Sequence, residues 1–473
     1  MRTFAINTIG CKVNQYESQQ IRELLERLGL NQVGTSQTEP DLIVINTCCV
    51  TLSASVKSRQ HIRKAQKLNP NAPIVVCGCL PTVQTGELNN PGKNIHLISH
   101  RETIAVTLSQ IINNGKAASS GSEGQNNTIK PKNGLKIKLK NPVEPPKFTK
   151  LTSFKGHTRA FLKIQDGCDG YCTYCIVPKT RPIVQNKPIE MVLQEAQALA
   201  DAGHKEIVVT GIFTGAYGQE SVRRKNWANQ QNDKLADLLD KLGEIPNLAR
   251  IRVSSLEPGD VTPRLLDTFC NNRKIMPHLH LSLQSGSNAV LKKMCRQYSA
   301  DEFKEKIALI KSRLDRPAIT TDIIVGFPGE TEADFEETVE LAKETGFAKM
   351  HVFSFSKRAG TAAASMQDTV DNEVMKKRSQ ILLALDAELG WKFREQFLGE
   401  EATILLENGE KGRSERYFMV HLYSEHACPE LACGEPIEPV EGVEPKKGEI
   451  VRVRLVKNSK NGCIASPLRV TIP

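Results

Sequence analysis

Short apolar runs and amphipathic stretches alternate along the amino-terminal part of the chain. Three short runs of apolar and β-branched residues have the length of buried strands: residues 3–10, 41–47 and 73–78. Residues 17–29 and 54–68, which lie between them, repeat apolar side chains every three or four positions and therefore predict helices. Strands that alternate with helices form parallel sheets, so we expect an open parallel α/β sheet over residues 1–112.

The same alternation is repeated over residues 155–397. Apolar runs there predict strands at residues 159–165, 206–211, 249–255, 278–284, 319–326 and 349–355. Amphipathic stretches such as residues 189–203 and 330–346 lie between them. The repeats are fewer than those of a closed eight-stranded barrel and predict a partial (β/α)6 barrel. In such barrels the chemistry lies where a strand ends and the loop to the next helix begins.

Two segments lack this alternation of strand and helix patterns. Residues 113–154 are rich in Asn, Gly, Ser and Lys, with five lysines and no acid between Lys130 and Lys140, which predicts a flexible basic linker. Residues 398–473 hold short strand-like runs separated by turns and predict a small β-barrel of the oligonucleotide-binding (OB) kind. Twelve Glu against ten Lys and Arg give residues 400–473 a net charge of −2.

Composition narrows the class of protein. The net charge of +10 suits a polyanionic partner, although ordinary globular proteins also reach it. The chain has no apolar run near 18 residues and no signal-peptide core at its start, so we expect a cytoplasmic protein without a membrane span. Disulfides are rare in that reducing compartment. The thirteen cysteines are therefore expected to be metal ligands or buried thiols.

One group of cysteines has ligand spacing. Cys168, Cys172 and Cys175 follow a predicted strand as C-x3-C-x2-C, and the nearest other cysteines are Cys79 and Cys270. Three thiolates can hold three irons of a cubane cluster and leave the fourth iron open to an amino-carboxylate ligand such as S-adenosylmethionine (SAM). The alternative is a zinc site that borrows a distant fourth ligand.

A second group is spread over the predicted amino-terminal sheet. Cys11, Cys48 and Cys79 each come directly after a predicted strand. The carboxyl ends of parallel strands share one edge of a sheet, so the three thiols can meet there, unless they are merely buried cysteines. Cys49 and Cys77 remain ambiguous, with Cys77 inside a strand. The other five cysteines are expected to be structural: Cys270, Cys295, Cys428, Cys433 and Cys463.

These features together resemble the radical-SAM methylthiotransferases over nearly the whole chain. "GCKVNQYES" (residues 10–18), "NTCCVT" (46–51) and Gly78-Cys79 match the amino-terminal domain of that family. The Cys168–Cys175 loop, "TDIIVGFPGETEADF" (321–335) and "FSKRAGTAAA" (355–364) match its radical-SAM barrel. The resemblance implies domains at 1–112, 155–397 and 398–473, the last being a TRAM domain, joined by a linker at 113–154.

The resemblance also implies cofactors and partners. Two [4Fe-4S] clusters are expected, one on each cysteine trio, with SAM bound at the cluster of the barrel. SAM contacts are expected from residues in or beside the strand ends: Tyr174, Thr210, Gly211, Glu257, Gln284, Asp322 and Phe355. The expected partners are a tRNA anticodon stem-loop and an electron donor such as flavodoxin or ferredoxin, and the chain is expected to be a monomer.

The motifs also favour one branch of the family. "GCKVNQYES", followed by "KSRQHIRKA" (residues 57–65), is similar to the branch that methylthiolates carbon 2 of N6-threonylcarbamoyladenosine at tRNA position 37. In this family one SAM gives the methyl group and another gives the radical that an unactivated C–H requires. The alternatives are isopentenyladenosine-37, an aspartate of a ribosomal protein, and a non-catalytic iron–sulfur RNA-binding module.

Overall fold

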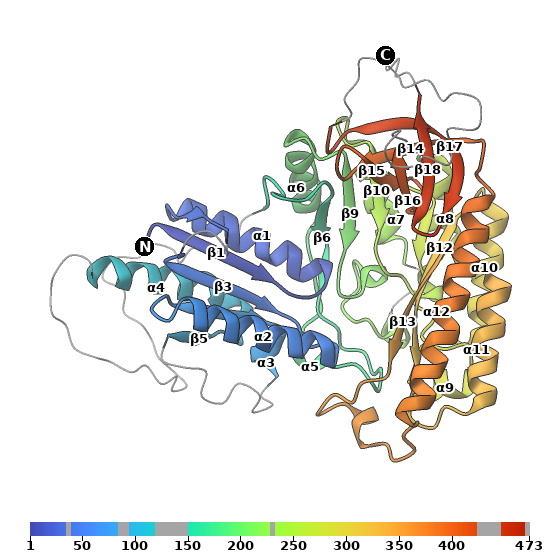
Figure 1. Ribbon diagram of the computed structural model, residues 1–473, viewed down its shortest axis with the longest axis horizontal. Helices are drawn as coiled ribbons and strands as arrows, with labels where there is room; N and C mark the ends of the chain where they lie inside the picture. The colour runs from blue at the N-terminus through green and yellow to red at the C-terminus, as the bar shows by residue number, and fades with distance from the viewer. Residues whose placement is uncertain (35–38, 84–93, 119–149, 228–231, 423–445, 469–473) are drawn as a thin grey trace. The chain divides into compact units, whose positions relative to one another are not determined.

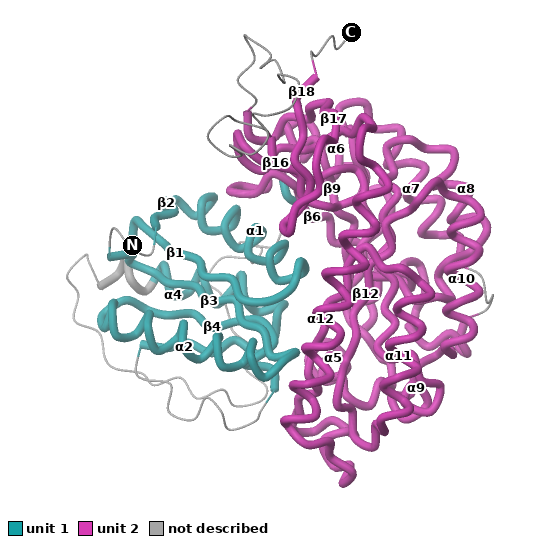
Figure 2. The backbone as a smooth tube through the Cα atoms, turned by 45° about the vertical axis from the view of Figure 1, so that its right-hand side comes forward, with its two compact units in different colours: residues 1–151 teal, residues 152–473 magenta. Residues whose placement is uncertain are grey.

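The computed structural model describes residues 1–34, 39–83, 94–118, 150–227, 232–422 and 446–468 (Figure 1). The chain forms two compact units, Met1–Leu151 and Thr152–Pro473 (Figure 2). Most of the predicted linker lies outside the described residues, and so do Cys428 and Cys433. Among the helices that the structure describes, none is both long and apolar enough to cross a lipid bilayer.

Unit 1 is built on a five-stranded sheet in the order β2-β1-β3-β4-β5, and every neighbouring pair is parallel. Its strands are β1 (Thr3–Thr8), β2 (Asn31–Gln32), β3 (Leu42–Thr47), β4 (Ile74–Gly78) and β5 (Ile95–Leu97). All six residues of β3 are buried, because this central strand is covered on both faces. The predicted open parallel α/β sheet is thus confirmed, with two short edge strands in addition.

The helices of unit 1 connect these strands. They are α1 (Lys12–Arg27), α2 (Leu52–Leu68), the single turn α3 (Cys79–Thr82), a 3-10 turn η1 (Arg101–Thr103) and α4 (Ile104–Ala118). Leu24 and Leu25 of α1 and Leu108 of α4 pack with Phe4 and Val44 of the sheet in one apolar core. Helix α4 continues six residues past the predicted boundary at residue 112, to Ala118.

The central part of unit 2 contains the predicted barrel strands in their predicted order (Figure 1). They are β6 (Ala160–Lys163), β9 (Glu206–Thr210), β10 (Arg250–Val253), β11 (His278–His280), β12 (Ala318–Val325) and β13 (Lys349–Ser354). Two parallel sheets, β10-β9-β6 and β11-β12-β13, are joined by bridges between Ile251 and Ile275 and between Leu256 and Leu281. The partial (β/α)6 barrel is confirmed.

Helices and short elements link these strands. The helices are α5 (Val177–Thr180), α6 (Ile189–Asp201), α7 (Lys234–Gly243), α8 (Pro263–Asn271), α9 (Asn288–Lys293), α10 (Ala300–Arg313), α11 (Glu332–Thr345) and α12 (Asn372–Glu395). Short elements are the hairpin β7 (Gln165–Asp166) and β8 (Gln185–Asn186), and the 3-10 turns η2 (Thr214–Ala216), η3 (Arg224–Asn226), η4 (Pro258–Asp260) and η5 (Ala362–Ser365). Thr331 and Ser299 each begin a helix with a capping box, so the local sequence fixes where α11 and α10 start.

The carboxyl-terminal part of unit 2 is a closed barrel in the order β14-β15-β16-β18-β17. Its strands are β14 (Glu401–Leu406), β15 (Lys411–Ser414), β16 (Met419–Leu422), β17 (Ile450–Ser459) and β18 (Gly462–Pro467). The predicted small β-barrel is confirmed. Its core continues into the central barrel, because Ile404 and Val453 share an apolar cluster with Ala318 of β12 and with Phe393 and Phe397 at the end of α12.

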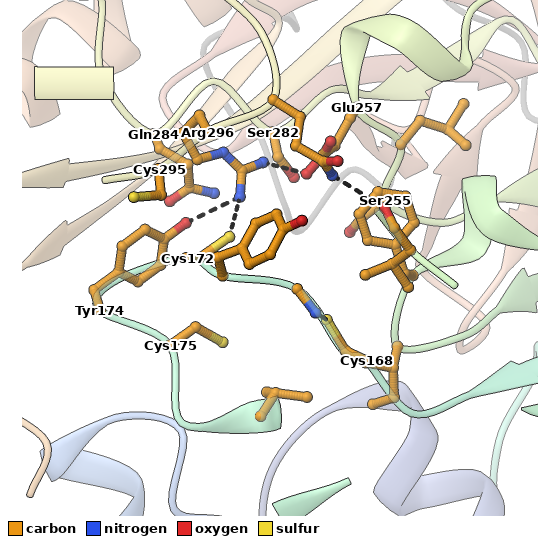
Figure 3. Close-up of a pocket in the computed structure, with 18 residues that line it drawn as sticks. Cys168, Cys172, Tyr174, Cys175, Ser255, Glu257, Ser282, Gln284, Cys295 and Arg296 are labelled. Atoms are coloured by element: carbon orange, nitrogen blue, oxygen red, sulfur yellow. Dashed lines mark hydrogen bonds and ion pairs between the residues drawn. The ribbon is translucent and has the colours of Figure 1, made fainter. Parts of the chain in front are cut away.

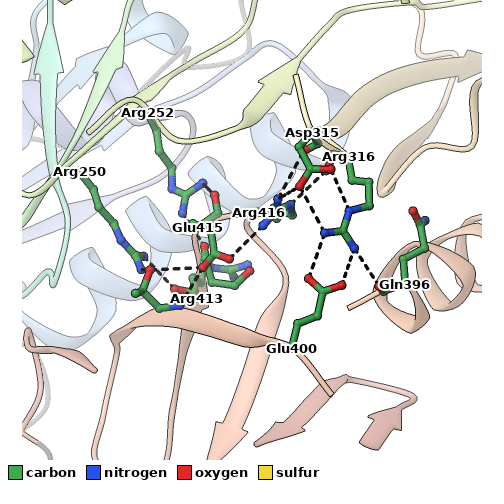
Figure 4. A network of polar contacts seen from close by, with 11 residues as sticks. Arg250, Arg252, Asp315, Arg316, Gln396, Glu400, Arg413, Glu415 and Arg416 are labelled. Atoms are coloured by element: carbon green, nitrogen blue, oxygen red, sulfur yellow. Dashed lines mark hydrogen bonds and ion pairs between the residues drawn. The ribbon is translucent and has the colours of Figure 1, made fainter. Parts of the chain in front are cut away.

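A buried polar contact also joins the two barrels (Figure 4). The Arg252 guanidinium donates to the backbone oxygens of Glu415, at 2.9 Å, and of Ser414, at 2.6 Å. Its Nε donates to Oε1 of Glu206 at 2.8 Å, where both side chains are buried. Burial alone would raise the pKa of Glu206, but Arg252, Arg250 and Arg159 outweigh it and lower that pKa.

Candidate functional site

The loop of the three cysteines follows the hairpin strand β7. Gly167 begins it with φ of 78°, and a Cβ there would lie 1.7 Å from the Ile183 oxygen, so only glycine fits. Cys168 N donates to the Arg181 oxygen at 2.8 Å, which ties the loop to the turn after α5. Gly170 N donates to Cys168 Sγ at 3.3 Å. The glycine at position 167 and these two hydrogen bonds therefore fix the path of the loop.

The three thiols border a cavity of about 150 Å³ (Figure 3). Its other walls come from the segments that follow β9, β10 and β11 and from the turn after α9. The polar lining outside the loop consists of Ser255, Glu257, Ser282, Gln284, Cys295, Arg296 and Gln297. The cavity thus lies at the carboxyl ends of parallel strands, the usual ligand position in α/β folds.

The chemistry of the three sulfurs suits a cationic metal group. Burial raises the pKa of Cys168 and of Cys175 to about 12, and it also raises the pKa of Cys172. Without a nearby positive charge of several units, these side chains stay neutral thiols. Bound iron supplies that charge and converts such thiols to thiolate ligands. The donor set therefore fits an iron–sulfur cluster.

An arginine joins the cysteine loop to the cavity wall. Arg296 Nη1 donates to Cys172 Sγ at 3.0 Å and to the Tyr174 hydroxyl at 3.3 Å, while Nη2 lies 2.5 Å from Oε1 of Glu257. Oε2 of Glu257 is buried and has no hydrogen-bond partner among the described residues. Burial, more than its charged neighbours, sets the raised pKa of Glu257. Arg224 Nη2 lies 3.8 Å from this Oε2, beyond hydrogen-bond distance, so the oxygen can still accept from a ligand that carries hydroxyl or ammonium groups, as SAM does.

The predicted SAM contacts separate into two groups. Tyr174, Glu257 and Gln284 line the cavity. The cavity lining does not include the other predicted contacts, which are Thr210, Gly211, Asp322 and Phe355. Phe355 packs edge-on against Phe327, and the Asp322 carboxylate lies 3.3 Å from Nε2 of His280. SAM contact stays an untested prediction for all seven residues.

The sequence reasoning missed several lining residues. Ser255 and Ser282 each lie two residues past a strand of the barrel, and that position after β10 and β11 is a signal that would have found them. Arg296 lies beyond α9, far in sequence from the cysteine loop. Its neighbour Cys295 has a φ of 54°, but nothing in the spacing of residues indicates that this turn reaches Cys172.

In unit 1, the structure places Cys11, Cys48 and Cys79 at the carboxyl edge of the sheet. A Cβ on Gly10 would lie 3.2 Å from Cys48 Sγ, so the residue before Cys11 lies against Cys48. Thr47 Oγ1 donates to the Cys77 oxygen at 2.6 Å and accepts from Leu80 N at 3.2 Å, which ties the segment around Cys79 to the end of β3. The expected convergence of the three strand ends is therefore present.

The two ambiguous cysteines differ in position. Cys77 lies inside β4 within the apolar core, and burial raises its pKa to about 12. Cys49 is fully buried, and its thiol lies 3.4 Å from the Cys79 oxygen. Arg101 Nη2 lies 3.6 Å from Cys79 Sγ and its Nε lies 3.4 Å from Glu17, so a cation stands beside one of the three predicted ligands.

Two family patterns match the chain. The Radical SAM superfamily matches residues 162–342, which contain the cysteine loop and all lining residues of the cavity. Uncharacterized protein family UPF0004 matches residues 3–99, which contain Cys11, Cys48 and Cys79.

Curated relatives align with most of the length of this chain. The chain is 37% identical over 459 residues to the threonylcarbamoyladenosine tRNA methylthiotransferase MtaB of Bacillus subtilis strain 168, covering 97% of this chain and 94% of the relative. It is 35% identical over 425 residues to the tRNA-2-methylthio-N(6)-dimethylallyladenosine synthase of Pelotomaculum thermopropionicum, covering 87% of this chain and 88% of the relative.

A solved structure shows the same fold in part. The radical S-adenosylmethionine methyltransferase TsrM of Kitasatospora setae, with cobalamin and a [4Fe-4S] cluster bound, aligns with a TM-score of 0.50 at 15% identity. The alignment covers 77% of this chain and 74% of TsrM. At that identity the likeness concerns the fold alone.

Proposed function

The chain belongs to the radical-SAM tRNA methylthiotransferases, and on that premise we propose that its substrate is N6-threonylcarbamoyladenosine at tRNA position 37. Members of the family use SAM and a [4Fe-4S] cluster. The support for the substrate is the name of the Bacillus subtilis relative, which matches 97% of this chain, together with the motif at residues 10–18. Dimethylallyladenosine is the alternative, because a relative of nearly equal identity carries that name.

In the barrel, Cys168, Cys172 and Cys175 would hold the cluster, and Glu257 and Gln284 would face SAM. The bound cofactors supply a radical for carbon 2 of adenine, an aromatic C–H that acid–base groups do not activate. Arg296 orients the loop through Cys172 and Tyr174 and keeps Glu257 in the cavity wall. The target base must leave its stack to reach this cavity, which costs little in an anticodon loop.

We extend the proposal to unit 1, where Cys11, Cys48 and Cys79 would hold a second [4Fe-4S] cluster that carries the sulfur for transfer. The supporting observation is the shared sheet edge of the three cysteines, two of which are buried. Among the described residues, neither cysteine trio has its ligand atoms mutually within 4.8 Å, as a single-ion site requires. A cluster has its ligands on different irons and so needs them further apart. A flavodoxin or ferredoxin would supply the electrons.

The test of the substrate is mass spectrometry of tRNA nucleosides from cells with and without this gene. We expect loss of 2-methylthio-N6-threonylcarbamoyladenosine and accumulation of N6-threonylcarbamoyladenosine. Loss of the methylthiolated dimethylallyl nucleoside instead would assign the other tRNA substrate. Unchanged tRNA with an unmodified ribosomal-protein aspartate would assign the protein substrate.

A second assay addresses catalysis itself. The purified, cluster-loaded protein should release 5′-deoxyadenosine when it is reduced in the presence of SAM. A non-catalytic RNA-binding module would release none, even when it binds tRNA tightly. The assay requires no knowledge of the modified nucleoside, so it separates an incorrect substrate from an incorrect reaction class.

A further inference from the structure

Three ligand-type side chains meet on the sheet β11-β12-β13 of the central barrel. His280 ends β11, Asp322 lies in the middle of β12 and His351 lies in β13. Their ligand atoms all lie within 4.8 Å of one another. No other trio of His, Cys, Asp or Glu in the described part of the chain meets this condition. None of the three residues lines the cavity of the cysteine loop.

Strand register brings the three side chains together. Asp322 and His351 are Cα partners across β12 and β13, and His280 is the partner of Thr320 across β11 and β12. Side chains two residues apart on a strand point to the same face, so Thr320 and Asp322 share a face with both histidines. The trio is therefore fixed by three strands rather than by mobile loops.

The distances within the trio suit a metal ion. Nε2 of His280 lies 3.3 Å from Oδ2 of Asp322. Donor atoms of a tetrahedral ion with bonds of about 2.0–2.1 Å lie about 3.3 Å apart. The His351 side chain is exposed, and one of its ring nitrogens lies within 4.8 Å of the ligand atoms of both His280 and Asp322.

The surroundings of His280 also match those of a metal ligand. Its Nδ1 lies 3.0 Å from Oγ1 of Thr320, which leaves Nε2 directed at Asp322. Metal-binding histidines almost always have the second ring nitrogen held by such a polar partner, which fixes the ring orientation. One carboxylate and two imidazoles form the facial ligand set that first-row divalent ions accept.

We propose that His280, Asp322 and His351 bind one divalent transition-metal ion, Zn²⁺ or Fe²⁺, separate from the iron of the clusters. Three protein ligands leave at least one position for water or for an oxygen of a substrate. The ion would also cross-link β11, β12 and β13 through one ligand from each strand. The proposal gives the Asp322 carboxylate a role other than the predicted SAM contact, in keeping with its position beside His280.

The test uses Co²⁺ as the probe on the full-length, cluster-loaded protein. The clusters are kept oxidised, because an oxidised [4Fe-4S] cluster is diamagnetic and leaves the Co²⁺ electron paramagnetic resonance signal visible. We expect one Co²⁺ per chain with nitrogen couplings from two imidazoles. His351→Gln should remove one of these couplings, and Asp322→Asn should weaken binding by about tenfold or more. Thr320→Val, which keeps the side-chain shape, should weaken it about 10- to 100-fold.

The matched control is His61→Gln, which removes an exposed imidazole from α2 and should leave Co²⁺ binding unchanged. A wild-type protein that binds no Co²⁺ through nitrogen overturns the proposal. So does a signal that persists in both His351→Gln and Asp322→Asn. If the wild type binds no Co²⁺ while both variants lose methylthiolation, the trio acts on the substrate and the metal site does not exist.

Discussion

Arg296 and Glu257 form a buried ion pair in the wall of the cavity beside the three cysteines, with Nη2 and Oε1 2.5 Å apart. The side chains are only 6% and 8% exposed, so neither charge is solvated well without the other. Because Arg296 also contacts Cys172, this pair connects the loop that would hold the cluster to the part of the wall that would face SAM.

The Arg296→Gln variant should lose both stability and SAM binding. Removing one partner of a buried pair costs about 3–5 kcal/mol, and we expect the lower end of that range because Arg224 Nη2 still lies 3.8 Å from the other carboxylate oxygen of Glu257. We expect a lower midpoint of urea unfolding and weaker SAM binding in equilibrium dialysis. Lys343→Gln is the control, because it breaks the exposed pair with Glu340 and should change stability by less than about 0.5 kcal/mol. Equal effects of the two substitutions would show that the buried pair has no special role.

Replacing Cys168, Cys172 and Cys175 together by Ala should remove one cluster. After anaerobic reconstitution, the wild-type chain should hold about eight irons and the variant about four. Iron is measured by a colorimetric assay, and release of 5′-deoxyadenosine should vanish in the variant. If the variant keeps about eight irons, the three cysteines are not the ligands.

Substitutions in unit 1 should separate ligands from structural thiols. Cys48→Ala should abolish methylthiolation without stopping cleavage of SAM, because only the proposed second cluster would be lost. Cys49→Ala and Cys77→Ala should keep methylthiolation, although Cys77→Ala should lower the midpoint of thermal unfolding because this thiol lies in the apolar core. An inactive Cys49→Ala beside an active Cys48→Ala would exchange the two assignments.

Glu206 should make the stability of unit 2 dependent on pH. The pKa of this carboxyl is lower in the folded chain than in the unfolded chain, so its stabilising effect is complete above the unfolded pKa of about 4.3. The effect is lost as the pH falls through the lower folded pKa. Glu206→Gln should therefore lower the free energy of unfolding by about 3–5 kcal/mol at neutral pH, and by progressively less as the pH falls.

Thermal unfolding of wild type and variant from pH 7 to pH 3 measures this difference. Glu401→Gln serves as the control, because the ion pairs of Glu401 with Arg452 and Arg454 are exposed. This substitution should change the free energy of unfolding by less than about 0.5 kcal/mol. A destabilisation by Glu206→Gln that does not shrink at low pH would disprove the linkage.

Salt dependence should show where the tRNA phosphates bind. We expect the basic linker to supply most of the affinity, so changing Lys132, Lys136, Lys138 and Lys140 to Gln should flatten the plot of log affinity against log salt. These lysines lie outside the described residues. Each lost phosphate contact should reduce the slope by about 0.7–0.9. The measurement is filter binding of tRNA at several salt concentrations.

The comparison variant changes Arg454 and Lys457, exposed cations of β17 in the small barrel, to Gln. Point substitutions are needed here, because deleting residues 400–473 would expose the apolar cluster that the small barrel shares with Phe393. If the slope changes only in the Arg454 and Lys457 variant, the phosphate contacts belong to the small barrel and not to the linker. Tyr417 and Phe418 are poor candidates for stacking on bases, because they pack on His278 and on Phe397.

The sequence was sufficient to predict the long buried strands and several of the residues that line the cavity. Runs such as residues 42–45 are apolar on both faces, and Cys11, Cys48 and Cys79 could be placed because each follows a strand of one sheet. Two short polar strands were missed, β2 at the edge of its sheet and β15 inside the closed barrel, because their pairing depends on the neighbouring strands rather than on their own residues. Arg296 was missed because its place depends on how α9 ends against the cysteine loop, a tertiary contact with no local pattern.

The contact between the two barrels has a consequence for mutational tolerance. Arg252 binds the small barrel at the backbone oxygens of Ser414 and Glu415, and Arg250 Nη1 binds the backbone oxygen of Arg413 at 3.1 Å. Every amino acid carries the same backbone oxygen, so these bonds depend on the path of the chain and not on the side chains of the barrel. Substitutions on the outer surface of the small barrel therefore leave these three backbone contacts in place, whereas a side-chain contact such as that of Arg250 Nη2 with Thr403 Oγ1, at 2.8 Å, depends on the residue present.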